Sequence, residues 1–121
     1  MFLILVMLVI GAVAGPPAYD SKFESIDIDD IINNDRILKN YVECFLDRRP
    51  CVKEAAEIKV LLADALKNVC ARCTPKQIKM IRKLDDVLMD RHKHVHEQIL
   101  RKYDPQNKYR GPFRRFLEEN S

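Results

Sequence analysis

Apolar residues recur along most of this 121-residue chain at steps of three and four positions, the spacing of one face of an α-helix. Alternating β-branched runs, which are typical of half-buried strands, are few. The pattern therefore predicts an all-α fold. We expect six short helices, of which the last is a terminal amphipathic turn, at residues 28–32, 35–45, 55–69, 75–88, 95–103 and 113–117.

Polar residues at the ends of these segments support the predicted boundaries. Asp27 and Asn34 are suited to cap the first two helices, because their side chains accept hydrogen bonds from the first free N–H groups. Thr74 is followed three positions later by Gln77, which is the sequence of a capping box, and Pro75 occupies the first helical position between them. Breaks are predicted at Pro50, at Asp104-Pro105 and at Gly111-Pro112.

The N-terminus has a different pattern. Residues 2–10 form an unbroken apolar run, which is shorter than the roughly 20 residues that span a bilayer. Ala12, Val13 and Ala14 follow with the small-x-small pattern that signal peptidase accepts. We therefore expect residues 1–14 to be a cleaved signal peptide, the protein to be secreted and extracellular, and residues 15–121 to form a single helical domain.

Charge and composition exclude several functions. The chain has 21 Lys and Arg against 18 Asp and Glu, and the basic residues are scattered among the acidic ones, so a nucleic-acid partner is not indicated. The serines lie near the termini, and Gly-rich phosphate loops are missing from the sequence. Adjacent carboxylates such as Asp85 and Asp86 point about 100° apart on a helix and make no catalytic pair. We expect no catalytic residues, no enzyme activity and no cofactor.

Four cysteines, Cys44, Cys51, Cys70 and Cys73, follow the spacing Cys-x6-Cys-x18-Cys-x2-Cys. Export favours disulfides, but four cysteines allow three pairings and the spacing alone does not select among them. A zinc site would need four thiolates, and the six-residue gap is outside the usual ligand spacing. A redox-active Cys-x-x-Cys would be expected in a βαβ context, which this sequence lacks. We expect two disulfides and no metal site.

Two further features leave the function open at this point. His92, His94 and His96 alternate, and only His92 and His96 would share a helical face, so without a third ligand we interpret them as a solvated helix end. Apolar stripes are normally used in packing, and composition alone favours a filled core over a ligand cavity.

Four blocks of sequence carry a resemblance to a known family. They are the cysteine spacing, Asp35-Arg36-Ile37-Leu38-Lys39-Asn40-Tyr41-Val42, Asp64-Ala65-Leu66 before Cys70, and Lys102-Tyr103-Asp104-Pro105. In this order they closely resemble the insect chemosensory proteins, also called OS-D-like or the pheromone-binding A10 type, over residues 19–113.

The resemblance implies a fold and a function. It implies a compact six-helix domain around a hydrophobic tunnel, with disulfides Cys44–Cys51 and Cys70–Cys73, in a secreted carrier of long-chain fatty acids, alcohols, esters and semiochemicals. The partners implied are a small hydrophobic ligand and a receptor, and we expect a monomer without an integral membrane span. The alternative is a secreted helical interaction protein in development or immunity without a dedicated ligand.

The resemblance also points to ligand-contacting residues. Tyr41, within the matching block, is expected as an aromatic wall or polar handle, and Tyr19 and Phe23 match the N-terminal aromatic residues of the family. Helical phase within the resembled helices adds wall candidates at Ile37, Ile58, Leu62, Leu66, Ile81 and Leu84.

The chain departs from the family pattern at three places. His96 stands where a Trp is frequent, Ala55 stands where a Gly is usual, and Gly111-Pro112 interrupts the expected start of the last helix.

Overall fold

The computed structural model of the chain describes residues 17–121, so the expected signal peptide, residues 1–14, lies outside the described residues. The elements are the 3-10 helix η1 (Ser21–Ser25) and the α-helices α2 (Ile28–Ile32), α3 (Asp35–Phe45), α4 (Lys53–Asn68), α5 (Pro75–Arg91), α6 (Lys93–Tyr103) and α7 (Arg110–Asn120). No strand occurs between residues 17 and 121. The predicted all-α fold with six α-helices is confirmed.

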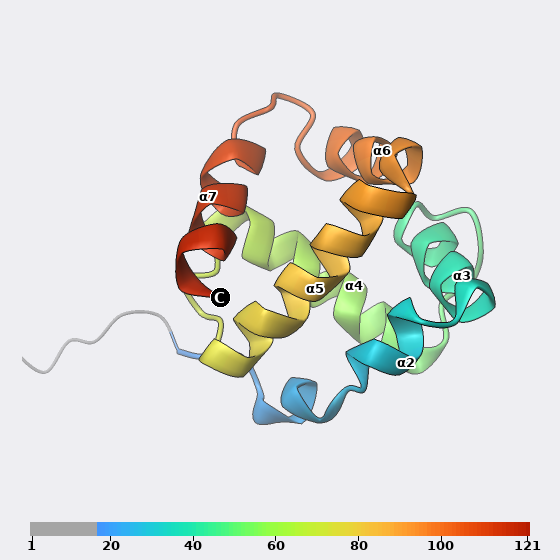
Figure 1. Ribbon diagram of the computed structural model, residues 1–121, viewed down its shortest axis with the longest axis horizontal. Helices are drawn as coiled ribbons and strands as arrows, with labels where there is room; N and C mark the ends of the chain where they lie inside the picture. Colours follow the sequence, from blue (N-terminus) through green and yellow to red (C-terminus); the bar gives the residue numbers. More distant parts are fainter. Residues whose placement is uncertain (1–16) are drawn as a thin grey trace, which may run out of the picture.

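Helix α5 occupies the centre of the molecule. Figure 1 shows it crossing in front of α4, with α7 on one side, α2 and α3 on the other, and α6 near its C-terminal end. It packs against α2, α6, α7 and η1, while α3 packs against α2 and α4. Because five of the other six elements contact α5 or cross it, the interior of the protein is built around this helix.

The predicted N-caps are confirmed. The Asp27 side chain accepts a hydrogen bond from the N–H of Asp30, and the Asn34 side chain accepts from the first turn of α3. At α5, the Gln77 N–H donates to Thr74 Oγ1 at 3.2 Å and the Thr74 N–H donates to Gln77 Oε1 at 2.9 Å, which completes the capping box. Local sequence therefore determines where these three helices begin.

Two elements differ from the sequence prediction. Helix α7 begins at Arg110 and has 11 residues, so it is longer than the predicted turn at 113–117 and Gly111-Pro112 does not interrupt it. Pro112 lies in the first turn, where backbone N–H groups have no intrahelical partner, and its missing N–H therefore costs no hydrogen bond. Helix η1 was not predicted, because its five residues contain one apolar side chain, Phe23, and show no periodicity.

The buried residues form two clusters on either side of the middle of α4. The first joins α2 and α3 to the first half of α4 and the C-terminal half of α5, and the second joins the rest of α4 and α5 to α7. Leu62 packs against both clusters. The interior is thus continuous through α4 and α5.

Both disulfides close corners between consecutive helices. Cys44–Cys51 has a Cα–Cα separation of 5.1 Å and bridges the turn from α3 to α4, and Cys70–Cys73 has a separation of 4.9 Å and bridges the link from α4 to α5. The second corner contains Val69 and Cys70 with φ of 54° and 57°. The pairing that the resemblance implied is the one found in the structure.

Candidate functional site

Helix α6 has an apolar face that is not fully buried. None of its residues is in the buried class, although Ile99 and Leu100 are large aliphatic residues. With His96 and Tyr103 they occupy positions i, i+3, i+4 and i+7, which lie on one face of a helix. These four side chains are half-buried, and all four line an apolar cavity that is partly open to solvent.

This cavity, called the α6 cavity below, has a volume of about 80 Å3 and lies between α4, α5 and α6. Most of its walls are aliphatic or aromatic, and four polar or charged residues contribute to them. Its lining consists of Phe45, Lys59, Leu62, Ala63, Leu66, Ile81, Leu84, Asp85, Leu88, His96, Ile99, Leu100, Tyr103 and Phe113.

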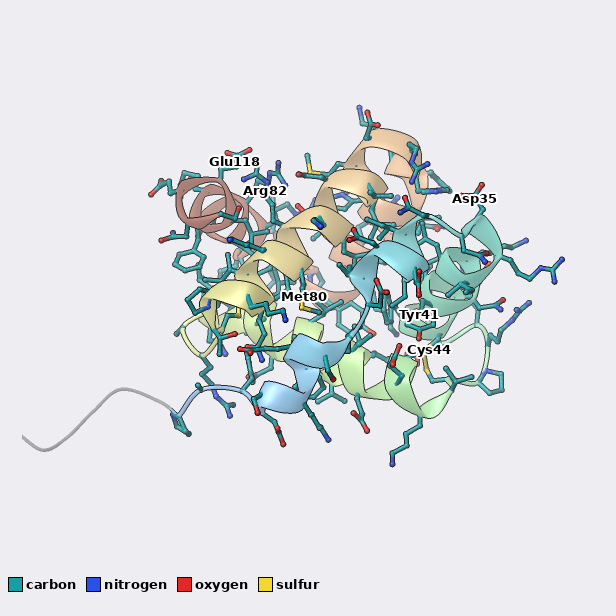
Figure 2. All side chains as sticks on the ribbon, turned by 60° about the horizontal axis from the view of Figure 1, so that its bottom comes forward. Asp35, Tyr41, Cys44, Met80, Arg82 and Glu118 are labelled. Carbon is teal, nitrogen blue, oxygen red and sulfur yellow. A yellow bond between two sulfur atoms is a disulfide. The ribbon has the colours of Figure 1, made fainter. Side chains whose placement is uncertain are left out.

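A second cavity, called the η1 cavity below, has a volume of about 40 Å3 and lies between the N-terminal segment, α4 and α5. Met80, labelled near the centre of Figure 2, belongs to its wall. The lining consists of Phe23, Ile26, Ile28, Ile58, Leu61, Leu62, Gln77, Met80, Ile81 and Leu84.

Three aliphatic residues, Leu62, Ile81 and Leu84, line both cavities. They come from the facing sides of α4 and α5 and form a partition between the two spaces. The hydrophobic tunnel that the resemblance implied is therefore divided here into two small cavities.

Five of the seven predicted ligand contacts line a cavity. Leu62, Ile81 and Leu84 form the partition, Leu66 lines the α6 cavity, and Ile58 lines the η1 cavity. Their helical phase on α4 and α5 was sufficient to identify them as inward-facing residues. Contact with a ligand stays a prediction for all five.

Tyr41 and Ile37 line neither of these cavities and pack against the first buried cluster instead. The Tyr41 hydroxyl donates a hydrogen bond of 2.7 Å to Glu54, and its ring meets Phe45 edge to face at 6.3 Å. Burial, together with the Glu54 carboxylate, raises the pKa of Tyr41 to about 12. Figure 2 shows Tyr41 on α3, on the opposite side of the molecule from Glu118 on α7. Ligand contact at Tyr41 and Ile37 also stays a prediction.

His96 is a wall residue of the α6 cavity and not the solvated helix end that the sequence suggested. Its Nε2 lies 2.8 Å from Asp85 Oδ1, and the two side chains are 15% and 18% exposed. The other oxygen of Asp85 accepts a hydrogen bond of 2.8 Å from Arg114. One carboxylate on α5 therefore holds side chains from both α6 and α7. Helical phase could have identified His96 as a wall residue, since it lies on the same face of the helix as Ile99, Leu100 and Tyr103.

The opposite end of the α6 cavity lies beside Tyr103. Its hydroxyl donates a hydrogen bond of 2.5 Å to the carbonyl of Phe45, and burial raises the pKa of the phenol. Nearby, Asp47 forms ion pairs with Lys59 and Lys102. Hydrogen bonds first from Lys102 and then from Lys59 lower the pKa of Asp47 to about 2. Sequence periodicity does not identify this end of the cavity, because its residues come from three separate segments.

The described residues, 17–121, bear on two further features: clusters of metal-ligating side chains and helices long enough to cross a membrane. In this part of the chain, no cluster of three or more His, Cys, Asp and Glu side chains is arranged to hold a metal ion. The described helices include none that is both long and apolar enough to cross a membrane.

The fold and the cavities define a class: small all-α proteins with two corner disulfides and an apolar internal space. The chain belongs to the insect pheromone-binding family A10/OS-D, whose family model matches residues 19–111. The resemblance that the sequence blocks carried is thereby confirmed.

Named relatives agree with this membership. The chain is 35% identical over 118 residues to ejaculatory bulb-specific protein 3 of Drosophila melanogaster. The matched region covers 98% of this chain and 94% of the relative. It is 38% identical over 93 residues to putative odorant-binding protein A10 of the same organism, covering 77% of this chain and 60% of the relative.

Solved structures show the same fold. A chemosensory protein in complex with bromo-dodecanol has a TM-score of 0.72 and 31% identity, covering 84% of this chain and 98% of that one. Antennal chemosensory protein A6 from the moth Mamestra brassicae has a TM-score of 0.68 and 31% identity, covering 84% and 94%.

Proposed function

We propose that this protein is a secreted carrier that binds small hydrophobic ligands in the space formed by the α6 cavity and the η1 cavity. The observation that carries the proposal is the apolar lining between α4, α5 and α6, with its polar atoms confined to a few residues. Apolar pockets with few polar groups are typical of small-molecule sites between helices. The complex of a related chemosensory protein with bromo-dodecanol supports a ligand with a long aliphatic chain.

The proposed ligands are fatty acids, alcohols, esters and semiochemicals with long chains. Burying each methylene contributes about 0.8 kcal/mol, so a twelve-carbon chain gains about 10 kcal/mol before association and ordering costs are subtracted. Micromolar affinity is consistent with the free energy that remains after these costs. Aliphatic walls distinguish poorly between ligands that differ by one methylene, so we expect broad specificity for chain length.

The volume of the cavities requires a structural change on binding. The α6 cavity, at about 80 Å3, is well below the roughly 300 Å3 or more of typical small-molecule pockets. Rotamer changes at Leu62, Ile81 and Leu84 would join the two cavities, but the η1 cavity adds only about 40 Å3, so the surrounding helices must also move apart to accommodate a long chain. The partition is aliphatic and uncharged, so moving it breaks no hydrogen bond or ion pair.

Ligand binding is tested with residues 15–121, expressed with both disulfides formed. A fluorescent apolar probe is bound first, and twelve- to eighteen-carbon acids, alcohols and esters are then added. We expect saturable displacement in the micromolar range. If the folded, oxidised protein binds neither the probe nor any ligand, the carrier function is wrong.

The predicted role of Tyr41 is tested in the same assay. Tyr41→Phe removes the hydroxyl and keeps the ring. A loss of affinity for alcohols and acids, without a loss for hydrocarbons, would support Tyr41 as a polar handle. Equal affinities in the variant and the parent would exclude the Tyr41 hydroxyl as a polar handle.

A second candidate function is a secreted helical interaction protein. It is favoured by two exposed apolar residues, Val52 at the N-cap of α4 and Val60 in the middle of that helix, which are 64% and 70% exposed. Such a protein would show no saturable displacement of the probe, so the same assay distinguishes the two functions.

A further inference from the structure

A surface groove of about 310 Å3 lies where the C-terminal ends of α4 and α6 meet the loop before α7. Figure 1 shows the C-terminal end of α4 on the same side of the molecule as α7 and the α6–α7 connection. We call it the lysine groove, because Lys67, Lys102 and Lys108 line it together with Tyr103 and Tyr109. All three lysines are exposed.

The only carboxylate in the lining of the lysine groove is that of Asp104, and its charge is directed into the protein. Asp104 is 1% exposed, and its oxygens accept backbone hydrogen bonds from Lys108 at 2.7 Å, Tyr109 at 3.1 Å and Arg110 at 2.9 Å. Burial acts to raise the pKa of Asp104, but these donors outweigh it and lower the pKa. The charge presented to solvent in the groove is therefore that of the lysines.

Two of the three lysines have no carboxylate partner between residues 17 and 121. Lys102 forms an ion pair of 2.7 Å with Asp47, whereas Lys67 and Lys108 form none in the described part of the chain. The Lys108 ammonium lies 5.4 Å from the centroid of the Tyr109 ring, a contact that leaves its charge unneutralised, so both lysines can bind an anion. Such a site requires neither a buried charge nor a change in backbone structure.

Tyr103 connects the lysine groove to the α6 cavity, because it belongs to the lining of both. Lys59, which also lines the cavity, is linked to Lys102 through their shared partner Asp47. A chain that fills the α6 cavity and ends beside Tyr103 would bring its terminal group to the lysines. The protein thus places an apolar site and a cationic site next to each other.

We propose that the lysine groove binds the anionic head group of a ligand whose chain occupies the α6 cavity. The preferred ligands are then anionic amphiphiles, such as long-chain carboxylates, rather than neutral alcohols or esters. This inference rests on the proposed carrier function and adds a head-group class to it. Exposed ion pairs strengthen binding about 1.5- to 5-fold each, so Lys67 and Lys108 together should favour an anion by several-fold.

The test compares three ligands that share one chain: dodecanoate, dodecanol and dodecylammonium. Displacement of a neutral fluorescent probe is measured with the whole of residues 15–121, below the micellar concentration of each ligand. We expect dodecanoate to bind several-fold more tightly than dodecanol, and dodecylammonium to bind most weakly. High salt should reduce these differences, because it screens charges at the surface.

Lysine variants test whether the preference for dodecanoate arises in the lysine groove. Lys67→Met and Lys108→Met, singly and combined, should lower the affinity for dodecanoate and leave that for dodecanol unchanged. Lys39→Met and Lys79→Met remove the same charge from exposed lysines outside the groove and should change neither affinity. Circular dichroism confirms that each variant is folded.

Asp47→Asn provides a gain-of-function test. Removing this carboxylate releases Lys102 and Lys59, so dodecanoate should bind more tightly while dodecanol is unaffected. Asp47 has a φ of 60°, which Asn tolerates well, so the turn should be preserved.

The outcomes separate the inference from the carrier function. Equal affinities for dodecanoate and dodecanol, unchanged in the Lys67 and Lys108 variants, would overturn the head-group site and leave a carrier of neutral ligands. Displacement of the probe by acetate, which has the head group without the chain, would show a site for free anions and overturn the assignment to amphiphiles. If no ligand binds the folded protein, both proposals fail.

Discussion

The hydroxyl of Tyr19 donates a hydrogen bond of 2.6 Å to Asp64, which is 45 positions further along the chain. The bond attaches the N-terminal segment to α4, and two neighbours reinforce it: Asn68 donates to the same hydroxyl, and the guanidinium of Arg72 lies 4.6 Å from the ring centroid. Burial first, and then Asp64, raises the pKa of Tyr19. Because Phe23 follows closely and lines the η1 cavity, this attachment also holds one wall of the proposed ligand site.

Tyr19→Phe should destabilise the protein by about 1 to 2 kcal/mol, because it removes a hydrogen bond to a charged group in a partly buried position. The free energy of unfolding is measured by urea denaturation. Tyr109→Phe is the matched control, since no hydrogen bond of the Tyr109 hydroxyl to another residue is present between residues 17 and 121. Equal losses in the two variants would contradict a specific role for the Tyr19–Asp64 bond.

The partition between the cavities gives a second prediction. Leu62→Ala should lower stability by about 2 kcal/mol, the lower end of the range for such truncations, because Leu62 is only partly buried. The same change should increase the affinity for long-chain ligands, because part of the partition no longer has to move. Probe displacement and urea denaturation measure the two effects.

Val60→Ala, on the exposed side of the same helix, is the control for the partition variant. It should change neither stability nor affinity appreciably. If Leu62→Ala lowers affinity for all chain lengths alike, the cavities do not join on binding.

The ion pairs of Asp47 give a prediction for pH. The pKa of Asp47 is lowered from 3.8 to about 2, so its contribution to stability is present above pH 3.8 and is lost as the pH falls through about 2. The parent protein should therefore lose more stability than Asp47→Asn between these pH values. Thermal unfolding at low salt measures the difference, which high salt should reduce. Parallel pH profiles for the two proteins would show that the pairs contribute nothing.

Removing one disulfide should affect the protein differently from removing the other. The loop-entropy relation gives about 2.5 kcal/mol for the eight-residue loop of Cys44–Cys51 and about 1.9 kcal/mol for the four-residue loop of Cys70–Cys73. The second corner also positions Arg72, whose carbonyl accepts a hydrogen bond of 3.0 Å from the Tyr19 N–H.

Replacing Cys70 and Cys73 by Ser should therefore expose the N-terminal segment to proteolysis, whereas replacing Cys44 and Cys51 by Ser should not. Limited digestion followed by mass spectrometry identifies the cleaved segment. Identical cleavage patterns in the two variants would show that the second corner has no special role in holding the N-terminus.

Local chemistry made most helix boundaries predictable. Asp27, Asn34 and Thr74 cap helices through hydrogen bonds that span only two or three residues, so the sequence around each contains the necessary information. The same reasoning failed at Gly111-Pro112, because a Pro that breaks a helix interior is compatible with a first turn, and the sequence alone does not show which position it occupies.

The ligand site was predictable only in part. Helical phase identifies the inward faces of α4 and α5, and therefore Leu62, Ile81 and Leu84. It does not show that the same three residues divide two cavities, because this depends on how the helices cross and on side-chain rotamers. His96 was misinterpreted because its neighbours His92 and His94 suggested a solvated run, whereas its partner Asp85 is 11 positions away on another helix.

Helix α6 has no residue in the buried class, and this affects how a ligand could enter. Local opening costs the least where few apolar contacts have to be broken. Among the six α-helices of the described chain, α6 alone has no fully buried residue, although it forms the outer wall of the α6 cavity. Displacing this one helix would open the cavity while the disulfide-closed corners on either side of α4 remain intact. Opening this wall would break the polar contacts of His96 with Asp85 and of Tyr103 with Phe45, but it would expose no fully buried residue of α6.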